Sequence, residues 1–304
     1  MKIYINKLNE SWIVDRLKKE WTSYNGHITT KRITNSNIIW IISPWTWKKI
    51  SKKQLNEKKV LCSIYHIDDK KFDKEELEEF LERDRYVSEY HVISNKTIPQ
   101  LKNLTDKKIT YIPFWVNQNK WYKIYEKDEL RSKYNFKEGQ YLVGSFQRDS
   151  EGSNPDLPKL IKGPDQFLEV VKHLNKIKPN LCVVLTGKRR NYVINELKKE
   201  KIDFSYFEMV DISKLNELYN LLDLYIVASR LEGGPQAIVE CGITKTPIIS
   251  TDVGIAKEIL SEESIFNMDN FRDAEPSIEF AYNKSKELTI PKGFEKFVKL
   301  FESI

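Results

Sequence analysis

Short apolar segments alternate with segments of helical periodicity along most of this chain. The first half contains apolar runs of strand length at residues 3–6, 38–43, 60–66, 91–94 and 110–114. Helical patterns lie between several of these runs, as at residues 13–21 and 74–85, where apolar positions recur three or four residues apart. Because strands that alternate with helices form βαβ units, the pattern predicts an α/β fold with a parallel sheet.

The alternation stops at a polar and aromatic segment near residue 118 and resumes near residue 141. Expected strands follow at residues 141–146, 181–186, 204–210, 224–229 and 247–251. Expected helices lie at residues 163–176, 192–201, 214–222, 255–260 and 294–301, with a further helix that opens near Pro235. The pattern therefore predicts two α/β domains at 1–117 and 139–290, a linker at 118–138 and a C-terminal helix at 291–304.

The segments that follow the expected strands are the places to look for a ligand site. In open parallel sheets, ligands bind beyond the carboxyl ends of the strands. Two such domains joined by a linker leave a cleft between them. In the second half, the segments expected to line it are residues 147–162, 187–190, 210–213, 230–235 and 252–255.

Composition narrows the class of protein. Hydrophobic residues make up 40% of the 304 residues and aromatic residues 12%, which supports a sizeable core and argues against global disorder. No run approaches the roughly 20 apolar residues of a membrane span, and the chain opens on a strand pattern rather than a signal peptide. The expected location is cytoplasmic, soluble or peripheral to a membrane. Three cysteines, Cys62, Cys182 and Cys241, share no metal-ligand spacing and predict buried free thiols.

The formal net charge of +6 is spread along the chain rather than gathered. Basic residues are mixed with acidic ones, and no dense basic stripe is interleaved with aromatic residues, so nucleic acid is not the expected partner. A mild positive charge also suits an anionic small molecule or the surface of an acidic membrane. Peripheral membrane contact is therefore left open.

Two carboxylates, Glu232 and Glu240, stand eight positions apart after the buried strand expected at 224–229. Glu232 would lie in the loop after that strand, where its oxygens could accept hydrogen bonds from sugar hydroxyls. Glu240 would lie further along the helix that follows and could hold a ribose diol. The plainer alternative is a turn followed by a surface acid.

The residues between the two carboxylates suit an anion. Gly233 and Gly234 have no side chain to block the close approach of a ligand. Pro235 fits the first helical position because it lacks only an amide that would be unpaired there. The amides of Gln236 and Ala237 then stand at the positive end of the helix, a geometry that attracts phosphate.

This half of the chain resembles the donor-binding domain of GT-B fold glycosyltransferases and is similar to glycosyltransferase family 4 (glycosyl transferases group 1). The two Glu residues match that family's spacing, Gly242 and Pro247 match the continuation, and residues 252–258 resemble the loop after it. The resemblance covers most of the chain and is most specific at 141–260. It implies two Rossmann-like domains facing a cleft, with Glu232 toward the donor sugar and Glu240 toward the nucleotide ribose.

Two basic residues match further parts of the family pattern. Arg148 follows a strand, and Lys162 precedes a glycine that opens a helix. A leaving nucleoside diphosphate gains negative charge in the transition state, and two fixed cations would stabilise it. The insert at 149–161 departs from the family pattern. Either cation could instead be one of 50 basic residues with no such role.

Other positions extend the resemblance into the nucleotide site. Gly187 and Lys188 follow a strand, as does the family's glycine-rich turn near the donor, although Lys188 could equally be part of a solvated turn. Met209 and Val210 lie in the segment whose backbone reads the nucleobase in that family. The side chain of Asp211 is more simply read as the cap of the next helix.

The first half matches the family less closely. Its usual Gly-Gly turn after the first strand is replaced by residues 7–12, which leaves the acceptor and phosphate contacts of that loop in doubt. His66, at the end of an expected strand, is the candidate for a histidine near the donor sugar, with a core or loop histidine as the alternative. His27 is read as structural.

The resemblance implies a retaining hexosyltransferase that moves a sugar from a UDP- or GDP-linked donor to an acceptor hydroxyl of a glycan, a lipid or a protein. Such proteins usually work without a bound metal, and no cofactor other than the co-substrate is expected. Three alternatives remain open at this point: an inactive nucleotide-sugar-binding protein, a sugar-nucleotide epimerase on the same fold, and a nucleic-acid-binding protein. The base, the sugar and the acceptor are open as well.

Overall fold

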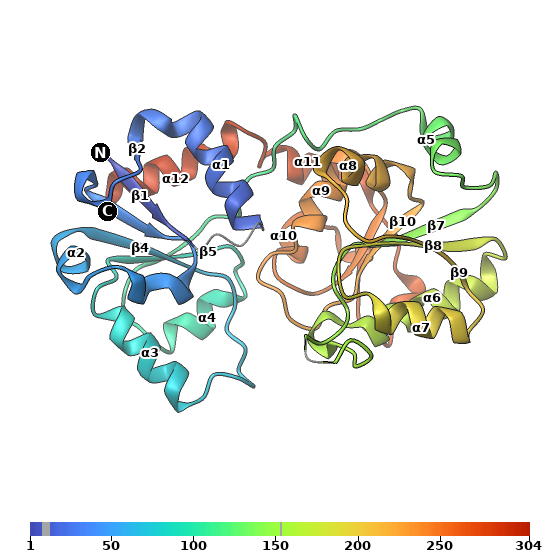
Figure 1. Cartoon of the computed structure of the whole chain (residues 1–304), viewed down its shortest axis with the longest axis horizontal. Coiled ribbons are helices and arrows are strands. Elements are labelled where there is room, and N and C mark those ends of the chain that lie inside the picture. Colours follow the sequence, from blue (N-terminus) through green and yellow to red (C-terminus); the bar gives the residue numbers. More distant parts are fainter. Residues whose placement is uncertain (8–12, 153) are drawn as a thin grey trace. The chain divides into compact units, whose positions relative to one another are not determined.

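The computed structural model describes residues 1–7, 13–152 and 154–304 (Figure 1). The chain forms two compact units, one made of Met1–Trp115 with Ile290–Ile304 and one made of Val116–Thr289. Each unit contains a six-stranded sheet in which neighbouring strands pair in parallel. The predicted α/β class is confirmed.

In the first unit the strand order is β2-β1-β3-β4-β5-β6. In chain order the strands are β1 (Ile3–Asn6), β2 (Thr29–Thr30), β3 (Ile38–Ile41), β4 (Lys59–Ile64), β5 (Glu89–Val92) and β6 (Ile109–Tyr111). The α-helices are α1 (Ile13–Asn25), α2 (Lys52–Glu57), α3 (Lys74–Asp84), α4 (Thr97–Lys102) and α12 (Lys292–Ser303). Strand β5 begins two residues before the apolar run predicts because Glu89, although charged, is buried and bonded to Lys108 and Thr110 beside it.

Helix α12, the last in the chain, packs in the first unit. Its apolar face presents Phe294, Phe297 and Phe301, at positions that fall on one side of a helix. These rings contact Trp21 of α1 edge-on at centroid distances of 5.4, 6.3 and 5.5 Å. The same core holds Trp115, whose indole nitrogen donates to Glu20 at 3.0 Å. Burial of these aromatic side chains fixes the C-terminal helix to this unit.

His91 of β5 lies within this aromatic core and is fully buried. Its Nε2 lies 2.7 Å from the carbonyl oxygen of Ile112, which makes Nε2 the donor, and its Nδ1 lies 2.8 Å from the Ser63 hydroxyl. Its ring lies 4.9 Å from that of Phe297. Burial lowers the pKa of His91 from 6.5 to about 4, although the hydrogen bond to Ile112 opposes this effect.

We therefore expect acid to destabilise the first unit through His91. The unfolded chain takes up this proton near pH 6.5, whereas the folded chain does so near pH 4. The contribution of neutral His91 to the free energy of unfolding is thus complete above pH 6.5. It is lost as the pH falls toward 4, and the loss is about 2 kcal/mol between pH 7 and 5. Chemical unfolding followed by tryptophan fluorescence measures it. His91→Gln should lose less stability over this interval than the wild type, and the exposed His27→Gln should match the wild type. Equal losses in all three proteins would contradict this assignment.

In the second unit the strand order is β12-β11-β10-β7-β8-β9. In chain order the strands are β7 (Tyr141–Ser145), β8 (Leu181–Thr186), β9 (Asp203–Phe207), β10 (Leu224–Val227), β11 (Ile248–Thr251) and β12 (Ile265–Phe266). The α-helices are α5 (Lys127–Lys133), α6 (Pro164–Ile177), α7 (Asn191–Lys199), α8 (Ile212–Leu221), α9 (Gln236–Thr244), α10 (Ala256–Ile259) and α11 (Ile278–Lys286).

The central strand β7 separates two cores. Leu142 packs with α8 and α9 on one face, and its neighbour Val143 packs with α6 and α7 on the other, because successive strand residues point to opposite faces. Figure 1 shows these helix pairs on the two sides of the sheet. Strand β7 pairs with both β8 and β10, so the loops after these three strands emerge side by side at one edge.

Most of the expected linker, 118–138, is packed into the second unit. Trp121, Leu130 and Phe136 are buried in its core. Asp223 accepts hydrogen bonds from Lys127 at 2.8 Å and Arg131 at 2.6 Å, which fixes α5 to the corner before β10. The segment lacks a strand pattern, but its aromatic and basic residues anchor it firmly. The connection between the units is therefore shorter than the sequence pattern predicts.

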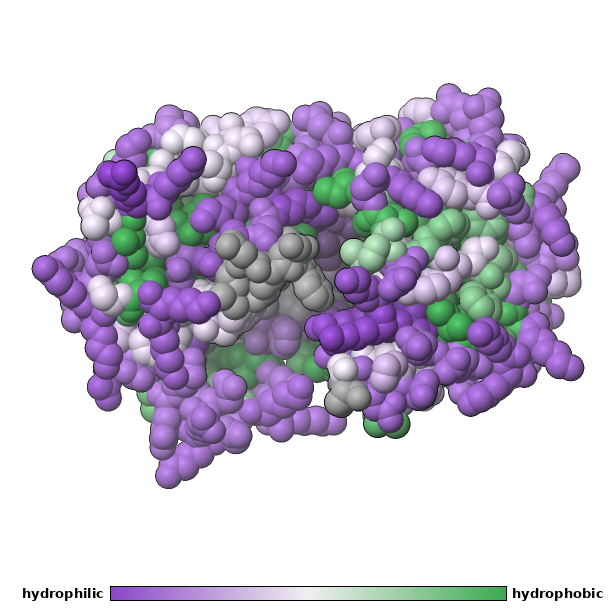
Figure 2. All heavy atoms as spheres, in the orientation of Figure 1, coloured by the Kyte–Doolittle hydropathy of each residue, from purple (hydrophilic) through white to green (hydrophobic). Residues whose placement is uncertain are grey.

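The face of the molecule in Figure 2 is largely hydrophilic. Within the described parts of the chain, no helix combines the length and the apolar character needed to cross a membrane. The three cysteines are buried free thiols, as predicted. Burial raises the pKa of the Cys62 and Cys182 thiols to about 11.

Candidate functional site

Lys162 and Glu232 form an ion pair at the carboxyl edge of the second sheet. Lys162 ends the short 3-10 turn before α6, and Glu232 lies in the loop between β10 and α9. The Lys162 ammonium donates to Oε1 of Glu232, and the Ser229 hydroxyl donates to the same oxygen at 3.1 Å. The two paired side chains are 22% and 15% exposed. They are accessible to a ligand but shielded enough for their charges to act strongly.

Gly163 brings Lys162 to this position. Its φ of +61° lies in the left-handed region, and a Cβ there would stand 1.7 Å from the carbonyl oxygen of Ala228. Only glycine allows the backbone to pass so close to the end of β10. Arg230 donates its backbone amide to Ile161 at 2.9 Å, which joins the same two segments. The Lys-Gly sequence thus places the cation beside the loop that carries Glu232.

The turn between the two carboxylates leads into helix α9 one residue later than predicted. Pro235 is the N-cap residue rather than the first helical residue, and α9 begins at Gln236. Gly254, with φ of +51°, supports the turn from the loop after β11. A Cβ on it would stand 2.7 Å from the Gly233 carbonyl oxygen and 2.9 Å from Cδ of Pro235. The backbone amides of Gln236 and Ala237 lie in the first turn of α9, as predicted.

Glu240 is not a surface acid. It is 5% exposed and lies in α9 beside buried Val239 and Cys241. The Tyr219 hydroxyl, from α8, donates to its Oε2 at 3.0 Å. Burial, aided by the Glu240 charge, raises the pKa of Tyr219 well above its usual value, so the phenol stays protonated and remains a donor. A carboxylate kept at such a buried position is typical of functional sites.

The turns after β8 and β9 are bonded to each other. The Gly187 amide donates to the Glu208 carbonyl at 2.9 Å, and the Tyr206 hydroxyl donates to the Gly187 carbonyl at 2.9 Å. Gly187 has φ of +93°, and a Cβ there would make only an ordinary van der Waals contact, with the Phe146 carbonyl oxygen at 3.9 Å.

The remaining candidates on these two turns lie at the surface. Lys188 is exposed, Met209 is 66% exposed and Val210 is half-buried. Asp211 caps α8 by accepting from the Lys214 amide at 2.8 Å, which confirms the plainer interpretation of its side chain.

Comparison with known proteins identifies this half of the chain. Residues 126–275 match the family model described as Glycosyl transferases group 1. The second unit belongs to this family. Over 163 residues the chain is 26% identical to the alpha-galactosylglucosyldiacylglycerol synthase of Streptococcus pneumoniae. That match covers 51% of this chain and only 40% of the relative.

Solved structures extend the similarity to both units. HepE from Anabaena, in complex with UDP and glucose, superposes with a TM-score of 0.75 at 12% identity, over 100% of both chains. Sucrose-phosphate synthase from Thermosynechococcus elongatus gives a TM-score of 0.69 at 13% identity, over 98% of this chain and 80% of that one. The chain has the GT-B fold, as the resemblance implied.

In this glycosyl transferase domain, the structure adds Gln147, Asp149 and Arg190, which the sequence pattern did not single out, to the predicted Arg148. Arg148 is half-buried and follows Gln147, whose side-chain amide donates to the Lys162 carbonyl at 2.9 Å. Asp149 and Arg190 form an ion pair at 2.7 Å and are only 3% and 1% exposed. Arg190 is the last residue of the basic run after Gly187, and this run is a signal that the sequence contains. The sequence contains no comparable signal for Gln147.

His66 is the candidate site residue in the first unit. His66 is exposed and follows β4, and its role near the donor sugar stays a prediction. Of the replaced loop, residues 8–12 lie outside the described residues.

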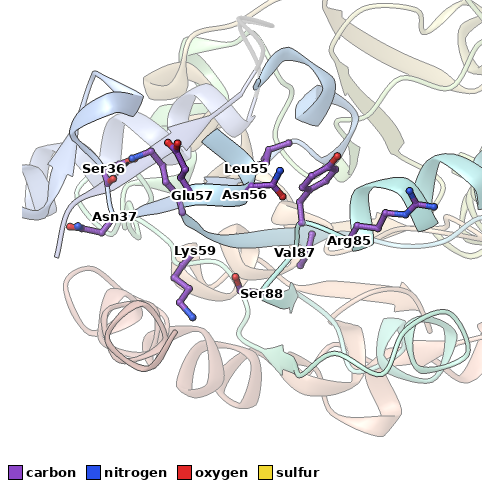
Figure 3. Close-up of a pocket in the computed structure, with 11 residues that line it drawn as sticks. Ser36, Asn37, Leu55, Asn56, Glu57, Lys59, Arg85, Val87 and Ser88 are labelled. Atoms are coloured by element: carbon purple, nitrogen blue, oxygen red, sulfur yellow. Dashed lines mark hydrogen bonds between the residues drawn. The ribbon is translucent and has the colours of Figure 1, made fainter. Parts of the chain in front are cut away.

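A surface pocket of about 660 Å³ lies in the first unit (Figure 3). Its lining includes Asn37, Lys59 and Ser88, which precede or begin β3, β4 and β5. It therefore lies at the amino edge of that sheet, whereas ligands of parallel sheets bind at the carboxyl edge. Among the described residues, no cluster of three His, Cys, Asp or Glu side chains could hold a metal ion.

Proposed function

We propose that this protein transfers a hexose from a nucleotide-diphosphate sugar to an acceptor hydroxyl with retention of anomeric configuration. The observation that carries the proposal is the Lys162–Glu232 ion pair beside the glycine turn that opens α9, within a glycosyl transferases group 1 domain. The presence of UDP and glucose in the HepE complex supports a UDP-linked donor.

Each part of the site has a chemical role in this proposal. The first-turn amides of α9 and Lys162, together with Arg148, receive the diphosphate, whose charge grows as it leaves. Glu240, held by Tyr219, accepts the ribose hydroxyls. Glu232 accepts from the sugar hydroxyls.

The nucleoside lies against the turns after β8 and β9. There Gly187 and Lys188 flank the phosphates of the nucleotide, and the backbone of Met209 and Val210 faces the base.

The reaction needs no covalent intermediate on the protein. The bond between the anomeric carbon and the leaving phosphate oxygen breaks, and the acceptor oxygen bonds to that carbon on the same face. The acceptor proton passes to the departing phosphate oxygen, so protons and charges balance. In this proposal the protein's own cations stabilise the phosphate, without a metal ion or a further cofactor, and His66 stays a candidate near the sugar.

For the acceptor, the name of the curated relative makes a glycolipid the first class to test. Glycans and proteins are the other classes. We place the reaction in the cytoplasm, with the protein soluble or peripheral to a membrane. None of the described features favours nucleic acid as a ligand.

A panel of UDP-, GDP- and ADP-sugars tests the proposal. We expect a UDP-hexose to raise the melting temperature and to release UDP when an acceptor is present, with a product whose anomeric configuration, read by NMR, equals that of the donor. Binding without release would indicate an inactive nucleotide-sugar-binding protein. An altered sugar on the same nucleotide would indicate an epimerase. The proposal is wrong if no nucleotide sugar binds, and its retaining part is wrong if the product is inverted.

Tyr219→Phe should weaken donor binding without slowing the chemistry. Removing the hydroxyl that bonds Glu240 takes one hydrogen-bond donor from a buried carboxylate, which costs about 1 kcal/mol of ribose binding. The KM for the donor should rise about fivefold and kcat should stay within twofold, because the contact is equal in ground state and transition state. Tyr134→Phe, which removes a hydroxyl bonded to Glu217 on the same helix, is the matched control. An unchanged KM in Tyr219→Phe would remove Glu240 from the ribose site.

A further inference from the structure

We propose that Gln147 is a positioning residue of the transfer site, and that its hydrogen bonds hold Lys162 and Glu232 in place. This inference rests on the proposed function, because it assigns a role within the same site. Gln147 follows β7 at the carboxyl edge of the sheet and is only half-buried. Its side chain does not have to touch the donor to affect transfer.

Both ends of the Gln147 amide bond to the two segments that carry the pair. Its Nε2 donates to the carbonyl oxygen of Lys162 at 2.9 Å, and its Oε1 accepts from the Ser229 hydroxyl at 3.3 Å. Ser229 is fully buried, and its hydroxyl also lies 3.1 Å from Oε1 of Glu232. The amide therefore bonds the backbone carbonyl of Lys162, and its Oε1 shares the single hydrogen of the Ser229 hydroxyl with the Glu232 carboxylate. These contacts cross from the loop after β7 to the two other segments of the site.

A rigid anchor fixes the backbone of Gln147. The guanidinium of Arg190 donates to the carbonyl oxygens of Gln147 and Ser145, the latter at 2.8 Å. Arg190 is itself paired with Asp149 at 2.7 Å, and both side chains are buried. Breaking a buried pair of this kind is strongly unfavourable because it leaves an uncompensated charge. Arg190 thus fixes this turn at two points, the carbonyl oxygen of Gln147 and the side chain of Asp149.

The same anchor removes a competing site for phosphate. Ser150 accepts from the Tyr192 amide at 3.0 Å, and Asp149 accepts from the Val193 amide at 3.4 Å. The first-turn amides of α7 are therefore occupied by protein oxygens, including a carboxylate that repels anions. The start of α7 is therefore less suited to the diphosphate than the start of α9, whose N-cap residue makes no side-chain hydrogen bond.

Positioning of this kind affects the transition state more than ground-state binding. A cation displaced by about 1 Å can lose about a hundredfold in rate, even when its substitution lies away from the reacting atoms. Gln147→Met keeps the volume of the side chain and removes both of its hydrogen bonds. Gln140→Met is the matched control, because Gln140 precedes the same strand at the opposite edge and its side chain accepts from the Lys137 amide at 2.8 Å, away from the site.

The test measures kinetics and the reactivity of Lys162 in parallel. We expect Gln147→Met to lower kcat about ten- to a hundredfold with KM within threefold. In a Lys162→Met background the same change should have little further effect, because residues that act through one another are not additive. Gln140→Met should match the wild type in both backgrounds.

Acetylation of Lys162, followed by mass spectrometry, reports on its position without any turnover. The rate should rise in Gln147→Met and stay at the wild-type value in Gln140→Met. Ser229→Ala, a smaller change to the same network, should raise it in the same direction and serves if Gln147→Met does not fold. If the wild type transfers no sugar, the proposed function fails. The acetylation rate of Lys162 then still tests whether Gln147 positions Lys162. A wild-type rate in both Gln147→Met and Ser229→Ala, or additive kinetic effects with Lys162→Met, overturns the inference.

Discussion

Lys162→Met is expected to lower turnover by a factor of about 10² to 10³, with a smaller change in donor KM. The ammonium is partly shielded from solvent, stands beside the turn that opens α9 and is paired with Glu232, while the Gln147 amide bonds the backbone carbonyl of the same residue. It needs no rearrangement as charge develops on the leaving diphosphate. Methionine keeps most of the length of the side chain and removes the charge. Release of UDP from a UDP-hexose under saturating acceptor measures the effect.

Lys172→Met is the matched control for this change. Lys172 lies further along α6, the helix that follows Lys162, and pairs with Glu200 at 2.7 Å. Its replacement should leave turnover within twofold of the wild type. If Lys162→Met also retained turnover within threefold, Lys162 would have no part in stabilising the leaving group. Glu232→Ala is also tested alone, because the carboxylate that Lys162→Met leaves without its cation would itself slow the reaction.

The main features of the fold could be predicted because they depend on local periodicity. Alternating apolar runs indicate parallel strands and helices, and the spacing of Glu232 and Glu240 places one in a loop and the other in α9 whatever the rest of the chain does. Burial of Glu240 could not be read in this way. Its partner Tyr219 is an ordinary aromatic position of α8, and only the packing of α8 against α9 brings them together.

Contacts between loops far apart in the sequence could not be predicted from the sequence pattern. Lys162 and Glu232 are 70 positions apart, and only the family resemblance placed them in one site. Gln147 carries no signal, because a glutamine after a strand is usually a solvated side chain. The expected linker illustrates the converse error. Without a strand pattern the segment reads as a connection, although Asn216 and Asp223, far along the chain, provide its partners.

Gly163→Ala is expected to cause the largest structural effect of any single methyl group at this site. A Cβ at Gly163 would stand 1.7 Å from the Ala228 carbonyl oxygen, which is backbone at the end of β10 and cannot turn away. The left-handed φ of +61° adds about 1 kcal/mol for a residue other than glycine. Relief of the clash requires the turn before α6 to move away from β10, and Lys162 moves with it. We expect a lower melting temperature and a loss of turnover close to that of Lys162→Met.

Gly139→Ala separates the two causes of this effect. Gly139 has φ of +75°, but no atom lies within 4 Å of a Cβ built there. Alanine at this position therefore introduces the backbone strain without the clash, and we expect it to cost about 1 kcal/mol with turnover within twofold of the wild type. The excess loss in Gly163→Ala then measures the contact with Ala228. If the two variants behaved alike, the close approach of Gly163 to β10 would not be what places Lys162 beside Glu232.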